Sequence, residues 1–249
     1  MIPPTRVAGT VAPLLKVLVS VRSSDEALLA ARGGADFIDL KEPGTGALGA
    51  LPVATIRGIV AALRAAHIAL PVSATIGDLP MKSLPEIGAR VEAVAGCGVD
   101  YVKVGIEAGV GAAAVLNWLA RCGKRIVPVF IADHGLDHAM IEHAAALRFP
   151  ALMVDTANKL AGSLFGVAAN DQLRRFIDTA RAAGSMAGLA GALRVEHVPA
   201  LGLLAPDFAG FRSAVCAGAR SDALDARRLA GLVQALRGAL PDADWRSVA

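Results

Sequence analysis

The amino-acid sequence predicts a single-domain α/β fold, a (β/α)8 TIM barrel, on three observations. Short apolar segments alternate with longer amphipathic segments along the chain, which is typical of repeated β-α units. Eight such units fit into the 249 residues, a usual length for this barrel. The first apolar segment continues into VRSSDEA, whereas the alternative architecture, a doubly wound open sheet, is expected to carry a glycine-rich turn there.

The elements follow in order. The expected strands are 15–21, 36–42, 71–78, 101–106, 125–133, 151–157, 186–193 and 208–216. The expected helices are 23–35, 52–66, 83–98, 112–123, 138–148, 170–184 and 225–240. Three of them have a polar N-cap and a glycine at the end: Ser24 to Gly33, Ser83 to Gly96, and Asn170 to Gly184.

No linker divides the chain. Residues 14–249 are therefore assigned to one catalytic barrel, and residues 1–13 to a flexible N-terminal leader. This leader has no apolar core of the kind that a secretory signal requires. No apolar run reaches the roughly 18 uncharged residues of a membrane span, so no membrane partner is expected.

Composition excludes several functions. The three cysteines, Cys97, Cys122 and Cys216, have neither metal-site nor disulfide spacing, which favours a reducing cytoplasm. The net charge of +3 is scattered rather than clustered, so nucleic acid is not an expected partner. The five histidines form no metal motif, and neither a metal nor another cofactor is predicted. The sequence leaves a homo-oligomer open.

Lysine is scarce. Arginine cannot lose its proton in a protein. A lysine amine can lose its proton and then attack a carbonyl carbon, so each lysine is a candidate nucleophile. Of the 25 basic residues only six are lysines, at 16, 41, 82, 103, 124 and 159. Lys16 and Lys124 begin strands, at the end of the barrel associated with stability. Lys82 is expected to be a surface charge.

The other lysines accompany acids at the C-terminal ends of strands, where such barrels carry their reactive groups. Asp39 and Lys41 share one face of the second strand, because side chains alternate along a strand. Lys103 lies between valines in YVKVG, where burial would favour the neutral amine of a nucleophile or base. Asp155 ends the sixth strand and Lys159 follows four residues later. A structural salt bridge at the barrel mouth is the alternative reading of Asp39 and Lys41.

The last two strand ends predict a phosphate site, since phosphate commonly binds after strands 7 and 8 of these barrels. Gly191 and Ala192 offer backbone N–H groups. Arg212 and Ser213 offer a charge and a hydroxyl, and the loop 217–222 adds Arg220. We therefore expect this end of the barrel to bind a phosphate group.

The chain resembles the (5-formylfuran-3-yl)methyl phosphate synthase family, also called 4-(hydroxymethyl)-2-furancarboxaldehyde-phosphate synthase, of methanofuran biosynthesis. The resemblance runs from about residue 14 to about residue 235, and DLKEP and DTANK are its most specific motifs. The other matching segments are VSATIGDLP, DYVKVG, LAGAL, EHVP and FRSAVCAG. Ser213 departs from the glycine expected in the last of them.

The resemblance implies a metal-free lyase that condenses two glyceraldehyde 3-phosphate molecules through a Schiff base, as a class I aldolase does. Phosphate and water leave, and a furan aldehyde phosphate remains. The family's Schiff-base lysine falls on Lys41 and its proton-transferring lysine on Lys103. The family's acid in the second strand falls on Asp39. The acid and the lysine of its sixth-strand motif fall on Asp155 and Lys159.

Two alternatives stay open. Another Schiff-base aldolase, acting on a different phosphosugar, would use the same two lysines. A non-catalytic barrel that senses a phosphosugar would bind it without a covalent bond.

Overall fold

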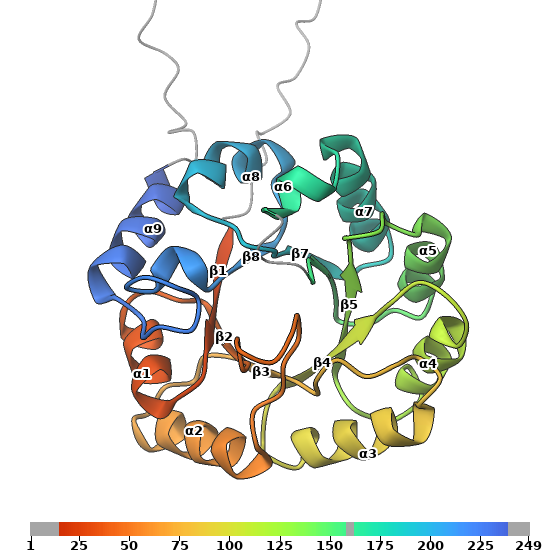
Figure 1. Ribbon diagram of the computed structural model, residues 1–249, viewed down its shortest axis with the longest axis horizontal. Coiled ribbons are helices and arrows are strands. Elements are labelled where there is room, and N and C mark those ends of the chain that lie inside the picture. The colour runs from red at the N-terminus through yellow and green to blue at the C-terminus, as the bar shows by residue number, and fades with distance from the viewer. Residues whose placement is uncertain (1–14, 158–161, 239–249) are drawn as a thin grey trace, which may run out of the picture.

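The computed structural model describes residues 15–157 and 162–238, and its strands form a closed parallel barrel (Figure 1). Each strand pairs with its neighbours in chain order, and the first pairs with the last. The predicted (β/α)8 fold is thereby confirmed. The strands are β1 (Lys16–Val21), β2 (Phe37–Leu40), β3 (Val72–Thr75), β4 (Tyr101–Ile106), β5 (Ile126–Ile131), β6 (Ala151–Asp155), β7 (Met186–Leu189) and β8 (Phe208–Phe211).

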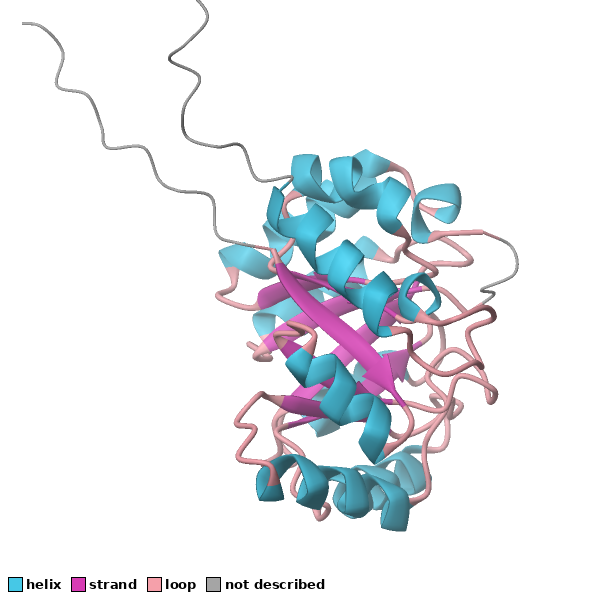
Figure 2. Cartoon of the chain, turned by 90° about the vertical axis from the view of Figure 1, so that its left-hand side faces the viewer, coloured by secondary structure: helices cyan, strands magenta, loops and turns pink. Residues whose placement is uncertain are grey.

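Helices surround this barrel (Figure 2). They are α1 (Ser24–Arg32), α2 (Val53–Ala65), α3 (Leu84–Ala95), α4 (Ala112–Leu119), α5 (His138–Ala146), α6 (Leu164–Val167), α7 (Asn170–Ala182), α8 (Val198–Leu204) and α9 (Ala226–Gly238), with short 3-10 turns η1 (Val195–His197) and η2 (Ser213–Val215). The seven expected helices are all present. Sequence periodicity missed α6 and α8, because four and seven residues are too few to show a helical repeat.

Two of the three predicted N-caps are displaced by one residue. The cap of α1 is Ser23, not Ser24, and its hydroxyl accepts the backbone N–H of Glu26. Asn170 is already the first residue of α7, whose N-cap is Ala169. Ser83 does cap α3, although its side chain makes no capping hydrogen bond. A run of polar residues marks a helix start in sequence, but only the hydrogen bonds select the cap.

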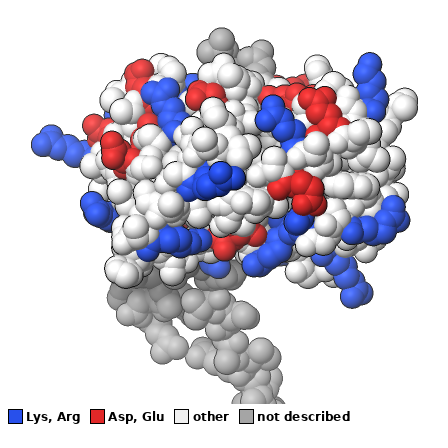
Figure 3. Space-filling model, turned by 90° about the horizontal axis from the view of Figure 1, so that it is seen from below, with Lys and Arg blue, Asp and Glu red and all other residues white. Residues whose placement is uncertain are grey.

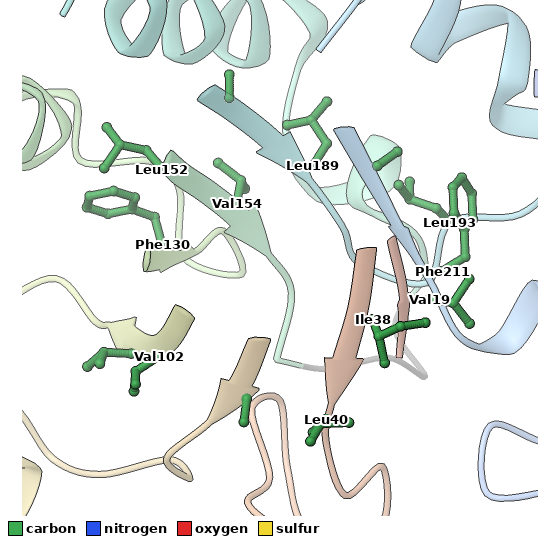
Figure 4. Close-up of a cluster of buried hydrophobic side chains, with 14 of the residues drawn as sticks. Val19, Ile38, Leu40, Val102, Phe130, Leu152, Val154, Leu189, Leu193 and Phe211 are labelled. Atoms are coloured by element: carbon green, nitrogen blue, oxygen red, sulfur yellow. The ribbon is translucent and has the colours of Figure 1, made fainter. Parts of the chain in front are cut away.

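The core has two layers, as alternation along the strands requires. Side chains on the outer surface of the barrel pack against the helices, and Figure 4 shows Ile38, Leu40, Val102 and Val154 among them. Side chains inside the barrel form a second apolar cluster, which includes Val129. The residue between Ile38 and Leu40, Asp39, therefore points inward.

The loop after β2, residues 43–50, folds over the C-terminal mouth of the barrel (Figure 1). Its Leu48 joins the interior cluster and lies against Gly105, where an added Cβ would come 2.8 Å from Leu48 Cδ1. Asp78, which follows β3, accepts the backbone N–H of Leu48 at 3.0 Å. The Asp78 carboxylate therefore holds this loop over the mouth.

Charged side chains are dispersed on the face seen from below in Figure 3, with both signs interspersed. Within the described residues, no helix is long and apolar enough to cross a membrane. No group of three or more potential metal-ligating histidine, cysteine or acidic side chains occurs in that same part of the chain. The leader, residues 1–13, lies outside the described residues.

Candidate active site

Four charged side chains from three strands meet at the barrel mouth. Asp39 and Lys41 come from the end of β2, Lys103 from β4 and Asp155 from the last position of β6, and all four line one cavity. Each is at most 7% exposed. The strands bring them there because their apolar neighbours face the helices, which turns the charged residues toward the barrel axis.

Asp39 and Lys103 form one buried pair, with 3.1 Å between Asp39 Oδ1 and Lys103 Nζ. Two hydroxyls also donate to this carboxylate, Ser73 Oγ at 2.6 Å and Ser20 Oγ at 3.1 Å. Strand register explains the contacts, because Ser20 and Ser73 lie opposite Asp39 on the two neighbouring strands. Three donors thus replace the water that the carboxylate loses on burial.

Lys41 and Asp155 form the second pair, with 3.2 Å between Lys41 Nζ and Asp155 Oδ2. The other oxygen of Asp155 accepts the backbone N–H of Thr156 at 2.7 Å. This bond fixes the carboxylate at the end of its strand while one oxygen faces the Lys41 amine. The amine of Lys41 and a carboxylate oxygen of Asp155 are therefore in contact inside the cavity.

Asp39 and Lys41 share a face, as predicted, but they form ion pairs with residues of two different strands. The observed arrangement buries two separate ion pairs side by side, each with its own desolvation cost of several kcal/mol per ion. Such clustering of buried ionisable groups in a cleft is typical of catalytic sites.

The ends of β7 and β8 form the opposite rim. Gly191 has φ of 117°, a backbone conformation that favours glycine, and an added Cβ would lie 2.9 Å from Thr156. Ala192 follows with φ of 47°, and Ser213 begins the short turn η2. Gly191, Ala192 and Ser213 line the same cavity as Lys41. The structure thus brings together the small residues that the sequence assigned to phosphate.

Arg212 also borders this cavity, but its guanidinium has other partners. It forms a bidentate pair with Glu26 of α1, at 2.6 and 3.1 Å. Its remaining N–H groups donate to the carbonyl oxygens of Ser20, Arg220 and Asp222. A guanidinium has five donors, and all five are used. Phosphate binding by the Arg212 side chain stays a prediction that would require one of these bonds to break.

The remaining lysines divide as expected. Lys16 starts β1 and lies over the Phe37 ring, and Lys124 pairs with Glu92 at the protein surface. Lys82 is exposed. Lys159 lies outside the described residues, so its predicted place beside Asp155 stays a prediction.

Sequence reasoning missed three residues around the site: Ser20, Ser73 and Glu26. Ser20 and Ser73 are polar residues inside apolar strands, and that signal could have found them. Glu26 gave no such signal, because an acid in the first turn of a helix is ordinarily a favourable exposed charge. Its burial follows only from the contact with Arg212, which is 186 residues away in the chain.

The model of the 4-HFC-P synthase family matches residues 17–233 of the chain. A provisionally named (5-formylfuran-3-yl)methyl phosphate synthase of Methylorubrum extorquens is 40% identical over 92% of this chain and 94% of its own length. The (5-formylfuran-3-yl)methyl phosphate synthase of Methanosarcina mazei is 35% identical, over 84% of this chain and 94% of its own.

Solved structures of other enzymes share the barrel. Phosphoribosyl anthranilate isomerase from Thermus thermophilus aligns with a TM-score of 0.63 at 18% identity, covering 90% of this chain and 99% of that protein. Identity this low establishes the fold alone.

Proposed function

Because the chain belongs to the 4-HFC-P synthase family, we propose that it condenses two glyceraldehyde 3-phosphate molecules to (5-formylfuran-3-yl)methyl phosphate, through a Schiff base on Lys41. Membership makes the chain a synthase-type enzyme and agrees with the motifs DLKEP and DTANK. The product would serve the biosynthesis of a methanofuran-type cofactor. The enzyme would be classified as a carbon–oxygen lyase, because the reaction breaks a carbon–oxygen bond and releases phosphate.

One observation carries the proposal: two lysines in the same cavity each contact a buried carboxylate. A Schiff-base enzyme needs one amine that becomes neutral and attacks a carbonyl. It also needs a second group that moves protons on the adjacent carbon. Lys41 and Lys103 are placed for these two tasks, and each has a proton acceptor within 3.2 Å.

The first step is the attack of Lys41 Nζ on the carbonyl carbon of one triose phosphate. Asp155 Oδ2 accepts the proton that the ammonium must lose, because it is the carboxylate oxygen in contact with that amine. Loss of water then gives an iminium. Its positive charge replaces that of the lysine beside Asp155, so the buried pair keeps its charge balance.

The iminium acidifies the neighbouring carbon, and a base must remove its proton to give an enamine. Lys103 serves as this base once its own proton passes to Asp39, which Ser20 and Ser73 hold in place. The enamine carbon then forms the new carbon-carbon bond to the aldehyde of the second triose phosphate. Ring closure, hydrolysis from Lys41 and elimination release one phosphate and two waters in total, which balances the atoms.

The test is incubation with glyceraldehyde 3-phosphate alone, followed by ultraviolet absorption of a furan aldehyde and by assay of free phosphate. We expect both signals, with one phosphate released for every two substrate molecules consumed. The Lys41→Arg variant keeps the charge but removes the nucleophile, and it should produce neither. Lys124→Arg, at the exposed pair with Glu92, is the matched control and should behave as the parent protein.

The two alternatives give different results in the same assay. Another Schiff-base aldolase would consume substrate through Lys41 without forming a furan or releasing phosphate. A sensor barrel would bind the triose phosphate and leave it unchanged. Either result would contradict the proposed synthase.

The described cysteines are free thiols, which supports the cytoplasm as the compartment.

A further inference from the structure

Among the described residues that line the cavity, charge pairing leaves one cation without an acidic partner. Lys41, Lys103 and Arg212 each have a carboxylate in contact. Arg220, from the loop after β8, lines the same cavity, and no carboxylate of the described residues lies within 4 Å of its guanidinium. An arginine in that condition has donors available for an anion.

The backbone around Arg220 is firmly held. Arg212 donates to the carbonyl oxygens of Arg220 at 2.9 Å and of Asp222 at 2.7 Å. The Asp222 carboxylate accepts the N–H of Ala219 at 2.8 Å, which closes the turn. Arg212 is itself fixed by Glu26. Two of the five Arg212 donors thus hold the loop that presents Arg220 to the cavity, and the other three fix Arg212 to Glu26 and Ser20. This is preorganisation of a binding group.

The side chain of Arg220 extends across the mouth to the loop 43–50. Its Nη2 lies 3.4 Å from the carbonyl oxygen of Gly46, a long hydrogen bond that a stronger acceptor would displace. Burial lowers the pKa of the Arg220 guanidinium, and the charge of Asp155 opposes this effect. The group is thus partly desolvated and lies in the electric field of the Asp155 carboxylate, yet the hydrogen bond that it donates is to a neutral carbonyl oxygen.

The position of Arg220 differs from that of the small residues of the β7 rim. Gly191 and Ala192 follow β7, whereas the Arg220 side chain bridges the loops after β8 and β2. All three residues line the cavity that holds Lys41. A condensation of two triose phosphates needs two phosphate positions flanking the Schiff base. The backbone at the β7 rim is the predicted place of the first phosphate, and Arg220 is the cavity residue available for the second.

We propose that Arg220 binds the phosphate of the second triose phosphate, the one that reacts with the Lys41-bound enamine. This inference rests on the proposed function for the identity of the substrate. The guanidinium gives up its contact with Gly46 and donates two N–H groups to the phosphate oxygens. Arg212 is a positioning residue, and the Glu26–Arg212 pair holds the loop on which Arg220 stands.

Arg220→Gln separates the two half-reactions. Borohydride reduction should still trap the first triose phosphate on Lys41 at a rate within about threefold of the parent protein. The glyceraldehyde 3-phosphate concentration for half-maximal furan formation should rise about 10- to 100-fold, the loss of a charged hydrogen bond. Arg220→Lys should recover part of this loss. Arg175→Gln, at the exposed pair with Glu142, is the control and should change neither.

A binding measurement makes the test independent of catalysis. Calorimetric titration with inorganic phosphate should show weaker binding by about 10-fold or more in Arg220→Gln than in Arg175→Gln. Equal phosphate binding and an unchanged substrate requirement in Arg220→Gln would overturn the proposal. Loss of the Lys41 adduct in Arg220→Gln would also overturn it, because Arg220 would then act on the first phosphate. If the parent protein forms no adduct while phosphate binding still depends on Arg220, the synthase assignment fails and the anion site stands.

Discussion

Asp39 and Lys41 leave β2 on the same face, two residues apart, yet each forms its ion pair with a different strand. Asp39 contacts Lys103 of β4 and Lys41 contacts Asp155 of β6. One short segment of sequence therefore anchors both halves of the site. Under the proposed function, this arrangement separates the nucleophile and its proton acceptor from the base and its own acceptor.

Trapping at Lys41 tests the covalent step. Sodium borohydride with glyceraldehyde 3-phosphate should add one reduced triose phosphate to the protein, and peptide mass mapping should place it on Lys41. The physical reason is that only an iminium is reduced to a stable secondary amine. Lys41→Arg should show no adduct while retaining the far-ultraviolet circular dichroism of the parent. An adduct at Lys103 instead would exchange the roles of the two lysines.

Asp155→Asn should slow the formation of the Lys41 adduct by about 10²- to 10⁴-fold, the usual contribution of a positioned proton acceptor. The amide cannot accept the proton of the Lys41 ammonium, although it keeps the shape of the side chain. Stopped-time borohydride trapping measures the rate. Asp178→Asn, at an exposed position on α7, is the matched control. Equal trapping rates in the two variants would remove Asp155 from the mechanism.

Asp39→Asn should destabilise the fold, because it leaves the Lys103 ammonium buried without its carboxylate. We expect a loss of about 3–5 kcal/mol in the free energy of unfolding, measured by urea titration. Glu92→Gln breaks the exposed pair with Lys124 and should cost no more than about 1 kcal/mol. If both variants lost the same small free energy of unfolding, the buried Asp39–Lys103 pair would contribute no more to stability than an exposed pair.

Gly46→Ala should disturb the loop that covers the mouth. The added Cβ would lie 2.0 Å from Asp78 Oδ2, and the φ of 101° is unfavourable for alanine. We expect a loss of about 1–3 kcal/mol and a lower rate of furan formation, measured by thermal unfolding and by the product assay. Gly58→Ala, in the middle of α2 with no neighbour within 4 Å of the new Cβ, should instead stabilise by about 0.4–1 kcal/mol.

The thiols should differ in reactivity. Burial raises the pKa of the Cys216 thiol, so its reactive thiolate is less populated than that of an ordinary cysteine at any given pH below that pKa. Iodoacetamide at about pH 8 should therefore modify the partly exposed Cys122 first, and Cys216 only after unfolding. Peptide mapping over time gives the order. Early labelling of Cys216 would show that the loop around Arg212 opens readily.

The raised pKa of Cys216 also sets the sign of a pH effect on stability. The folded protein holds this proton more tightly than the unfolded chain, so its contribution is complete below the unfolded thiol pKa of about 8.5. Above that pH the unfolded chain releases the proton first. The free energy of unfolding should therefore decline as pH rises, by an amount that Cys216→Ala removes in urea titrations at successive pH values.

Sequence alone determined the order of the elements and the residues that face the barrel axis. The eight strands were all recognisable, although six of them end earlier than expected, because residues such as Ile76 and Leu193 are buried beyond the last residue of their strands. Alternation placed Asp39, Lys41, Lys103 and Asp155 inside the mouth. These are local properties, with a period of two residues, and a local pattern is enough to predict them.

Only the tertiary structure decided which acid meets which amine, and which arginine is engaged. Lys41 and Asp155 are separated by 114 residues, and Glu26 and Arg212 by 186. Such pairs depend on the stagger of strands that are not neighbours, and on where a loop settles over the mouth. No short-range pattern contains that information, so the sequence offered Arg212 as the phosphate ligand, whereas the fold commits its guanidinium to Glu26 and the loop of Arg220.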